Sequence, residues 1–478
     1  MQRRAGAVFL SGGLFLATPA AAGNSDLETR VARIENMLAT IVERLENGEA
    51  SLSREEAAAM RQALDVVSEI DKPAALEGTT TAAMPKDTND SRDRRPRMQP
   101  LDNGPNTPPE PPPNGFMIGS TRVALAGFIK LDATVTDFSG GSLPDGSLGR
   151  DFLIPGLIPV GGDDADAVFD TNPRETRFMV VTETPVGGLE IGSKLELDFQ
   201  VTSDGNERVS NSFTPRIRQG YFTVGNWLFG QAWSTFQDVT ALPENLDFIG
   251  PTEGTVFIRQ PMIRYSRAGF EFAIEQPETT VTTASGGRLT PGEEFLPDLV
   301  GRYVTRGAWG HFSAAVLASA LSVDADPRTG LDNDIALGIG GSLSGSFKVG
   351  KTDDIRWMAN AGTGIGRYMG VNLINDAAIK KDGSLEPIPL YSGFVSYRHF
   401  WSRHWRSNLT GSVFFADHPV DLTSGAVTES AYSGHLNLIY SPVEGLDFGL
   451  EAIYARRETA SGLDGAMRRL QFSSKYSF

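Results

Sequence analysis

The chain has 478 residues, of which 40% are hydrophobic and 21% are charged, and its formal net charge is −16. The acidic balance argues against a nucleic-acid-binding protein, and the lack of cysteine excludes disulfides, thiolate metal sites and a cysteine nucleophile. Beyond the N-terminus, no apolar run approaches the roughly 18 residues that a membrane-spanning helix needs.

Residues 1–22 have the pattern of a cleaved signal peptide. Arg3 and Arg4 form a basic start, residues 5–16 are mostly apolar, and Ala20–Ala22 provide small residues for cleavage. The alternative is a short buried helix. We expect export across the inner membrane, without a lipid anchor because no cysteine follows the small residues.

Residues 23–72 are predicted to form a helical coiled-coil oligomerisation segment. Its apolar seam has spacings of 4, 3, 4, 3 and 4 and consists of Leu27, Val31, Ile34, Leu38, Ile41 and Leu45. Leucine at the a positions with isoleucine at d favours trimers or tetramers over dimers. A helical hairpin within one chain is the alternative.

Residues 73–114 are predicted to form a linker without a core. Residues 98–114 read MQPLDNGPNTPPEPPPN, a composition typical of extended or disordered chain. Arginines at 92, 94, 95 and 97 precede this stretch. They would either contact peptidoglycan or anionic headgroups, or simply be solvated.

Residues 115–478 alternate between apolar and polar side chains. Between Thr121 and Phe138, for example, Ile129 and Leu131 share one face, and Lys130 and Asp132 share the other. Sixteen strands are predicted at 120–137, 174–184, 189–202, 214–225, 227–236, 257–266, 268–276, 297–305, 308–321, 331–349, 353–369, 389–400, 403–416, 431–441, 445–457 and 466–478. Long and short connections alternate, which is typical of outer-membrane barrels.

The predicted fold is therefore all-β, a 16-stranded antiparallel transmembrane β-barrel with an N-terminal coiled-coil segment. Its charged face suits a wet lumen, and its apolar face suits lipid. A soluble β-sandwich is the alternative. Interfacial aromatic girdles are expected from residues near strand ends, namely Trp227, Trp309, Trp357, Tyr368, Tyr397, Trp405, Tyr440 and Tyr454.

Six short motifs follow one another along this region. They are GFIKLD at 127–132, RETRF at 174–178, RQPMIRY at 259–265, EQPET at 275–279, LPDLVGRY at 296–303 and GIGRY at 364–368. Together with an exported coiled coil, they resemble the DcaP-like family of trimeric outer-membrane porins. The resemblance implies a homotrimer in the outer membrane of a Gram-negative bacterium, among outer-membrane lipid and lipopolysaccharide. It also implies passive diffusion of small anionic solutes, dicarboxylates in particular.

The selectivity of a passive pore depends on charged side chains at its narrowest level. By resemblance to porins, the long loop 237–256 is expected to fold inward as a constriction loop. It carries the carboxylates Asp238, Glu244, Asp247 and Glu253. Opposite these carboxylates, arginines would create a transverse field, and an anion would pass between guanidinium groups that bind carboxylates with two hydrogen bonds.

The basic residues predicted to line the pore share the polar face of their strands. They are Lys130, Arg177, Arg216, Arg218, Arg264 and Arg302. Arg259 is also predicted to line the pore. Because it is out of phase with Arg264, we expect it to lie at a strand end or a bulge. For each arginine the alternative is a salt bridge along the wall, to residues such as Glu190, Glu196 or Asp298.

No other chemistry is indicated, so we predict no catalytic residue, no cofactor, no metal site and no enzyme activity. The five histidines lack metal-ligand spacing, and Gly362–Gly366 is interpreted as a glycine-rich strand. The second hypothesis is a structural barrel that tethers the envelope to the cell wall through residues 24–114. A surface hydrolase using His418 or His435 is the third, and it lacks a convincing partner residue.

Overall fold

The computed structural model describes residues 115–201, 211–290, 294–323 and 334–478. The predicted signal peptide, coiled coil and linker lie outside the described residues. None of the helices in the described ranges is long and apolar enough to cross a membrane.

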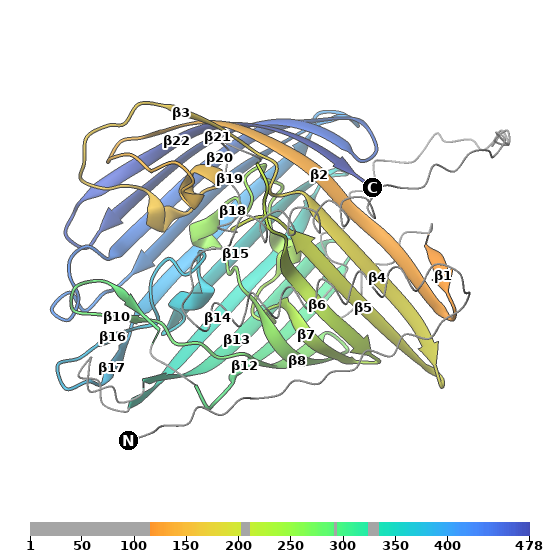
Figure 1. Cartoon of the computed structure of the whole chain (residues 1–478), viewed down its shortest axis with the longest axis horizontal. Helices are drawn as coiled ribbons and strands as arrows, with labels where there is room; N and C mark the ends of the chain where they lie inside the picture. The colour runs from red at the N-terminus through yellow and green to blue at the C-terminus, as the bar shows by residue number, and fades with distance from the viewer. Residues whose placement is uncertain (1–114, 202–210, 291–293, 324–333) are drawn as a thin grey trace, which may run out of the picture. The chain divides into compact units, whose positions relative to one another are not determined.

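Sixteen long antiparallel strands close into a barrel, as predicted (Figure 1). They are β2 (Thr121–Phe138), β4 (Arg177–Val186), β5 (Leu189–Asp198), β6 (Arg216–Val224), β7 (Trp227–Trp233), β8 (Arg259–Arg267), β9 (Phe270–Glu275), β12 (Asp298–Gly307), β13 (Gly310–Val323), β14 (Asp334–Val349), β15 (Asp353–Thr363), β18 (Pro389–Phe400), β19 (Trp405–Ala416), β20 (Thr428–Val443), β21 (Leu446–Thr459) and β22 (Asp464–Ser477). Two short strands, β1 (Phe116–Ile118) and β3 (Val168–Asn172), pair with β2.

Strand β2 closes the barrel, because it pairs with β22 on one edge and with β4 on the other. The C-terminal residue takes part in the seam: the Phe478 amide donates to the Gly127 carbonyl at 3.0 Å, and the Gly127 amide donates back at 3.1 Å. A Cβ atom at Gly127 would lie 2.2 Å from the Arg177 carbonyl oxygen. Only glycine therefore allows the three strands to approach this closely.

The two faces of the wall differ in polarity, as the alternation predicts. In β2, Ile129 and Leu131 are exposed on the outside, whereas Lys130 and Asp132 point inward and are buried. Outer aromatic side chains gather near the short turns. Ring centroids are 4.9 Å apart for Trp227 and Tyr265, 4.6 Å for Trp405 and Tyr440, and 5.8 Å for Trp309 and Phe347. Tyr368 was wrongly assigned to this girdle, since it is buried in an inward-folded loop.

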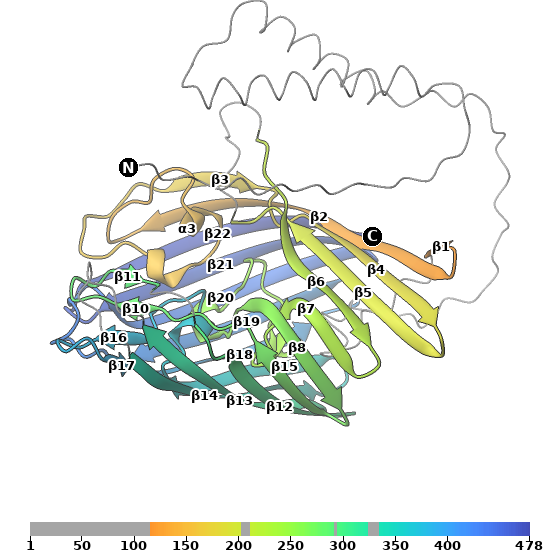
Figure 2. The same cartoon turned by 60° about the horizontal axis from the view of Figure 1, so that its bottom comes forward.

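Long loops and tight turns alternate around the barrel, and the loops lie at the left in Figure 1. Three loops matter below: the first loop (139–176, β2 to β4), the third loop (234–258, β7 to β8) and the sixth loop (364–388, β15 to β18). The first contains α3 (Leu148–Asp151). Outside the wall strands, β10 (Val281–Thr282), β11 (Arg288–Leu289), β16 (Ala377–Ile379) and β17 (Leu385–Pro387) form a small sheet (Figure 2).

Two predicted strands end earlier than expected. Strand β7 stops at Trp233 instead of residue 236, and β15 stops at Thr363 instead of residue 369. Gly364 has a φ of +65°, and a Cβ there would lie 2.7 Å from Leu321 Cδ1. This backbone turns the chain inward, so Gly362–Gly366 is not a continuous strand.

The third and sixth loops pack an apolar core against the inner wall from β9 to β20. Phe236 and Val256 of the third loop and Met369 of the sixth contact wall residues such as Leu317 and Phe414. Gly340 of β14 permits this packing, because Ile365 Cδ1 and Phe236 Cζ come within 2.7 and 3.4 Å of the position a Cβ would take. One sector of the interior is therefore dry, while the inner faces of β4, β5 and β6 carry charges.

Candidate functional site

The third loop folds inward, and its acidic residues attach it to the wall. The Glu244 carboxylate accepts hydrogen bonds from Arg406, with Oε1 2.6 Å from Nη2 and Oε2 2.9 Å from Nε, and from Arg398 Nη1 at 3.2 Å. Burial of Glu244 alone would raise its pKa, but Arg406 and Arg398 lower the pKa to about 2. Glu244 is therefore an ionised tether to β18 and β19.

Asp238 fixes the beginning of the same loop against β13 and β14. Its Oδ2 lies 2.8 Å from His311 Nε2 and accepts from the Ser344 hydroxyl at 2.9 Å, while its Oδ1 accepts from Thr240. Although burial opposes ionisation, the bond to His311 lowers the pKa of Asp238. This carboxylate is therefore also occupied by wall and loop donors.

The middle of the loop is held by β2, β21 and β22. The Leu246 carbonyl accepts from Lys130 Nζ at 2.7 Å, and the Leu246 amide donates to Glu451 at 2.8 Å. Asp247 lies 3.6 Å from Arg469 and accepts from the Leu153 amide of the first loop at 2.9 Å. Burial raises the pKa of Asp247 and of Glu253, which is fully buried.

These contacts correct one expectation. Asp238 lies close enough to the predicted Arg302 for their charges to interact, but the ion pairs of the loop carboxylates are not with the predicted arginines. The ion pairs join these carboxylates to Arg398, Arg406, Arg469 and His311 instead. The physical reason is that an acidic loop can lie inside the barrel only if its charges find partners on the wall that it covers.

Four of the arginines predicted to line the pore, from β4, β6 and β8, form one cluster with Lys194 of β5. We call this cluster the basic wall. It consists of Arg177, Lys194, Arg216, Arg218 and Arg259, together with Glu196 and Asp198. Arg218 bonds to Glu196 at 2.7 Å and to Asp198 at 2.6 Å. Arg216 reaches Asp198 at 2.6 Å, and Arg177 and Lys194 reach Glu196 at 3.4 and 3.0 Å. Five cations against two carboxylates leave this cluster with a net positive charge.

A β-bulge aims two neighbouring side chains of β6 into the cluster. The register with β5 shifts between Glu196, which faces Gln219, and Leu197, which faces Ile217. Arg218 and Gln219 consequently both point inward, and both bond to Glu196. Bulges are a common way to redirect a side chain at a functional site. The predicted salt bridges to Glu196 are thus present, but they do not neutralise the cluster.

The face of the third loop that meets the basic wall is aromatic. The Arg218 guanidinium carbon lies 5.3 Å from the Phe248 ring centroid and 5.6 Å from that of Trp233. For Arg259 the distances are 4.6 Å to Trp233 and 5.8 Å to Phe257. Arg259 is the first residue of β8, which agrees with its predicted place at a strand end. The side chains of Arg216 and Arg177 are 25% and 16% exposed, so solutes can reach them.

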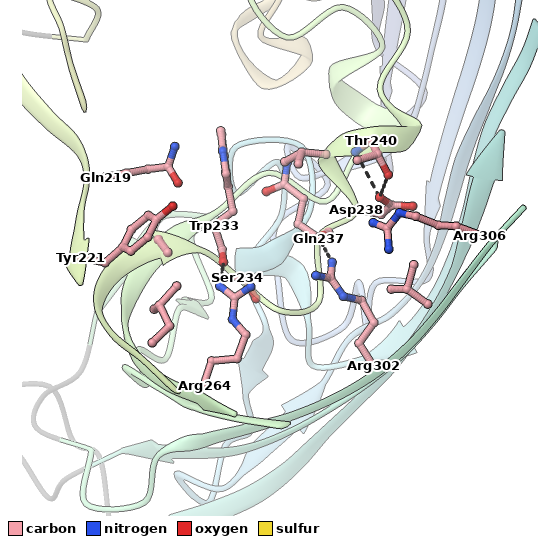
Figure 3. A pocket seen from close by; sticks show the side chains of 14 residues that line it. Gln219, Tyr221, Trp233, Ser234, Gln237, Asp238, Thr240, Arg264, Arg302 and Arg306 are labelled. Carbon is pink, nitrogen blue, oxygen red and sulfur yellow. Dashed lines mark hydrogen bonds between the residues drawn. The ribbon is translucent and has the colours of Figure 1, made fainter. Parts of the chain in front are cut away.

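The remaining predicted basic residues lie elsewhere. Lys130 is buried and bonds to Glu175 at 2.6 Å, so it anchors loops instead of lining open space. Burial raises the pKa of Glu175 to about 7, against the opposing effect of Lys130. Arg264 and Arg302 point into a separate pocket beneath the start of the third loop (Figure 3).

Several basic residues with inward side chains were missed by the sequence reasoning. They are Arg356, Arg398, Arg406 and Arg469. Strict alternation would have found them: Arg398, for example, has the opposite parity to the exposed Val395 and Tyr397. Across the described ranges, no group of three or more histidine, aspartate or glutamate side chains is placed to hold a metal ion.

Comparison with known proteins gives a consistent picture of the barrel. Residues 119–478 match the family model described as DcaP outer membrane protein. The crystal structure of the outer membrane channel DcaP of Acinetobacter baumannii is similar, with a TM-score of 0.64 and 25% identity over 76% of this chain and 99% of that chain.

Two more distant structures also match. The anion-selective porin from Comamonas acidovorans has a TM-score of 0.47 and 12% identity over 75% of this chain and 100% of that chain. OmpT of Vibrio cholerae has a TM-score of 0.44 and 11% identity over 76% of this chain and 100% of that chain. No curated protein matches the chain.

Proposed function

Because the chain belongs to the DcaP outer membrane protein family, we propose that it is a porin for the passive diffusion of small anionic solutes. It is a porin-like β-barrel of the Gram-negative outer membrane, and its family and its similar solved structure are outer-membrane proteins rather than enzymes. The proposal concerns the solutes, the residues that select them and the oligomeric state.

The observation that carries the proposal is the net positive basic wall facing an aromatic side of the third loop. The loop turns its carboxylates toward the opposite wall, where Glu244 meets Arg398 and Arg406. An entering ion therefore meets Arg177 and Arg216 without an opposing row of carboxylates. Fixed positive charge in a narrow lumen concentrates anions and excludes cations.

Carboxylates are the solute class that fits this wall best. A guanidinium group binds a carboxylate through two parallel hydrogen bonds, so neighbouring arginines suit a solute with two carboxylates. Dicarboxylates are therefore the proposed preferred solutes. A homotrimer is proposed as the assembly, on the basis of the heptad seam in residues 27–45.

Reversal-potential measurements on the purified protein in a planar lipid bilayer test the proposal. Under a potassium chloride gradient, we expect the sign that indicates chloride preference, and added dicarboxylate should produce blocking events. A cation preference would refute the proposal. The alternative, an envelope tether through residues 24–114, depends on residues outside the described ranges, and no described contact favours it.

A further inference from the structure

We propose that two neighbouring short turns form a binding site for the headgroup of an anionic phospholipid. The turns join β14 to β15 and β18 to β19, at the end of the barrel opposite the long loops (Figure 1), and they are adjacent because β15 pairs with β18. We call their exposed basic residues, Lys348, Lys351 and Arg403, the turn patch. This site lies on the rim of the barrel and does not depend on which solutes pass through the lumen.

The three cations of the turn patch are exposed, and none of them forms an ion pair within the part of the chain that the structure describes. Arg403 Nε donates to His404 Nε2 at 2.8 Å, and His404 Nδ1 lies 2.9 Å from the Ser441 carbonyl oxygen. An imidazole that accepts at Nε2 and donates from Nδ1 is neutral. These bonds therefore orient the guanidinium of Arg403 without neutralising its charge.

Asp353, at the start of β15, is occupied by other donors. Its Oδ2 accepts from the Tyr397 hydroxyl at 2.7 Å and lies 2.8 Å from His399 Nδ1. Its Oδ1 accepts from the Thr352 hydroxyl at 3.0 Å and from the Phe400 amide at 3.1 Å. This carboxylate is therefore held by its own neighbours and does not pair with the turn patch.

The remaining charges near these turns leave the rim positive. Asp354 accepts hydrogen bonds from Arg356 Nε and Arg398 Nε, each at 2.9 Å. Two carboxylates further inside are matched by two cations, and these four residues are Glu244, Asp447, Arg406 and Lys475. When Asp353 and the exposed Glu444 of the next turn are also counted, cations still exceed carboxylates by two.

Aromatic residues place the turn patch at the level of the lipid headgroups. Trp401 is 66% exposed, and its ring lies 4.4 Å from that of His399 on the outer side of the turn. Along the wall toward the loops, Val395 and Leu409 are exposed on the apolar outer face. Aromatic side chains at the end of an apolar barrel wall mark the membrane interface. A lipid bound at the turn patch therefore has an apolar wall for its acyl chains, which a soluble anion would not use.

The chemistry of the turn patch favours an anionic headgroup over a zwitterionic one. The short turns of an outer-membrane barrel face the periplasm, where the leaflet consists of phospholipids. Guanidinium and ammonium groups donate to phosphate oxygens, and clusters of basic residues beside membrane-spanning segments attract anionic lipids. A headgroup such as that of phosphatidylglycerol carries no cation of its own to oppose this attraction. By contrast, the turn between β4 and β5 carries the exposed Glu190 and no lysine or arginine.

Native mass spectrometry of the purified full-length protein, titrated with lipid in detergent, tests the site. The first phosphatidylglycerol should bind with a lower apparent dissociation constant than the first phosphatidylcholine. In Arg403→Gln the constant for phosphatidylglycerol should rise roughly fivefold, the loss expected for one basic residue beside an anionic lipid. Arg403→Lys retains the charge and should keep most of the preference for phosphatidylglycerol.

Arg267→Gln is the matched control, because Arg267 is also exposed at a short turn, but the turn between β12 and β13 separates it from the turn patch. It should bind phosphatidylglycerol like the unchanged protein. Equal constants for the two lipids in the unchanged protein would overturn the site, and so would equal weakening in Arg403→Gln and Arg267→Gln. Displacement of the lipid by an equal concentration of soluble glycerophosphoglycerol would overturn the assignment to a lipid.

Discussion

Replacing Arg216 by glutamine should weaken anion selectivity without disturbing the fold. Among the arginines of the basic wall that form an ion pair, Arg216 is the most exposed, with 25% of its side chain accessible to solvent. Its partner Asp198 keeps a hydrogen bond from Arg218 at 2.6 Å, so the substitution leaves no buried carboxylate without a donor. The change therefore removes one positive charge and little else.

The magnitude follows from Coulomb's law. One unit charge at roughly 6 Å from a permeating ion contributes about 0.7 kcal/mol at the permittivity of water. That energy changes the local concentration of an anion about threefold, and that of a cation about threefold in the opposite sense. The permeability ratio of chloride to potassium should therefore fall roughly tenfold in Arg216→Gln.

The assay is the reversal potential of single channels under a potassium chloride gradient at low ionic strength, where screening is weak. Arg267→Gln, an exposed residue at a turn, controls for the loss of one charge outside the lumen. A permeability ratio in Arg216→Gln equal to that of the control would refute the reasoning that the basic wall lies along the permeation path.

Three further predictions concern the inward-folded loops. Glu244→Gln should loosen the third loop, because it weakens the charged bonds that tie the loop to Arg398 and Arg406, which keep Asp354 and Asp447 as partners, at a cost of roughly 1–3 kcal/mol; single-channel current noise should increase. Gly364→Ala should destabilise the sixth loop by roughly 1–2 kcal/mol, since a left-handed backbone at φ +65° disfavours a Cβ; limited proteolysis of the loop should become faster. Burial raises the pKa of Asp376 in the sixth loop from 3.8 to about 6. The protonated carboxyl therefore stabilises the folded loop. This stabilisation is complete below pH about 4 and is lost as the pH rises through 6, and it amounts to roughly 3 kcal/mol for the two-unit shift. Hydrogen exchange of the loop, corrected for intrinsic rates, should be faster at pH 7.5 than at pH 5.

Each of these expectations has a contrary outcome. Unchanged current noise in Glu244→Gln would mean that the remaining contacts, such as the bond between Lys130 and the Leu246 carbonyl, suffice to hold the loop. Proteolysis of Gly364→Ala at the rate of a Gly383→Ala control, also at positive φ but in the turn between β16 and β17, would contradict the packing argument. Exchange that slows as the pH rises would contradict the assignment to Asp376, and Asp376→Asn should flatten the dependence.

The strand pattern could be read from the sequence because a barrel wall has lipid on one side and polar groups on the other. Every second residue must then be apolar, which fixes the phase of residues such as Ile129 and Lys130 without knowledge of their neighbours. The alternation of loops and turns follows from the same local pattern. The early end of β15 was missed because a single glycine backbone angle, at Gly364, sets it.

The partners of the charges depend on tertiary structure. Parity predicts that Arg218 points into the barrel, and the resemblance to porins predicts that the loop with Glu244 folds inward, but neither predicts that a bulge draws Arg218 to Glu196 and Asp198. Glu244 and Arg406 are 162 residues apart and meet only because the third loop crosses the lumen. The sequence by itself therefore determined the wall and the direction of its side chains. The fold decided which charges neutralise one another and which remain for a solute, because Coulomb interactions depend on distances in space.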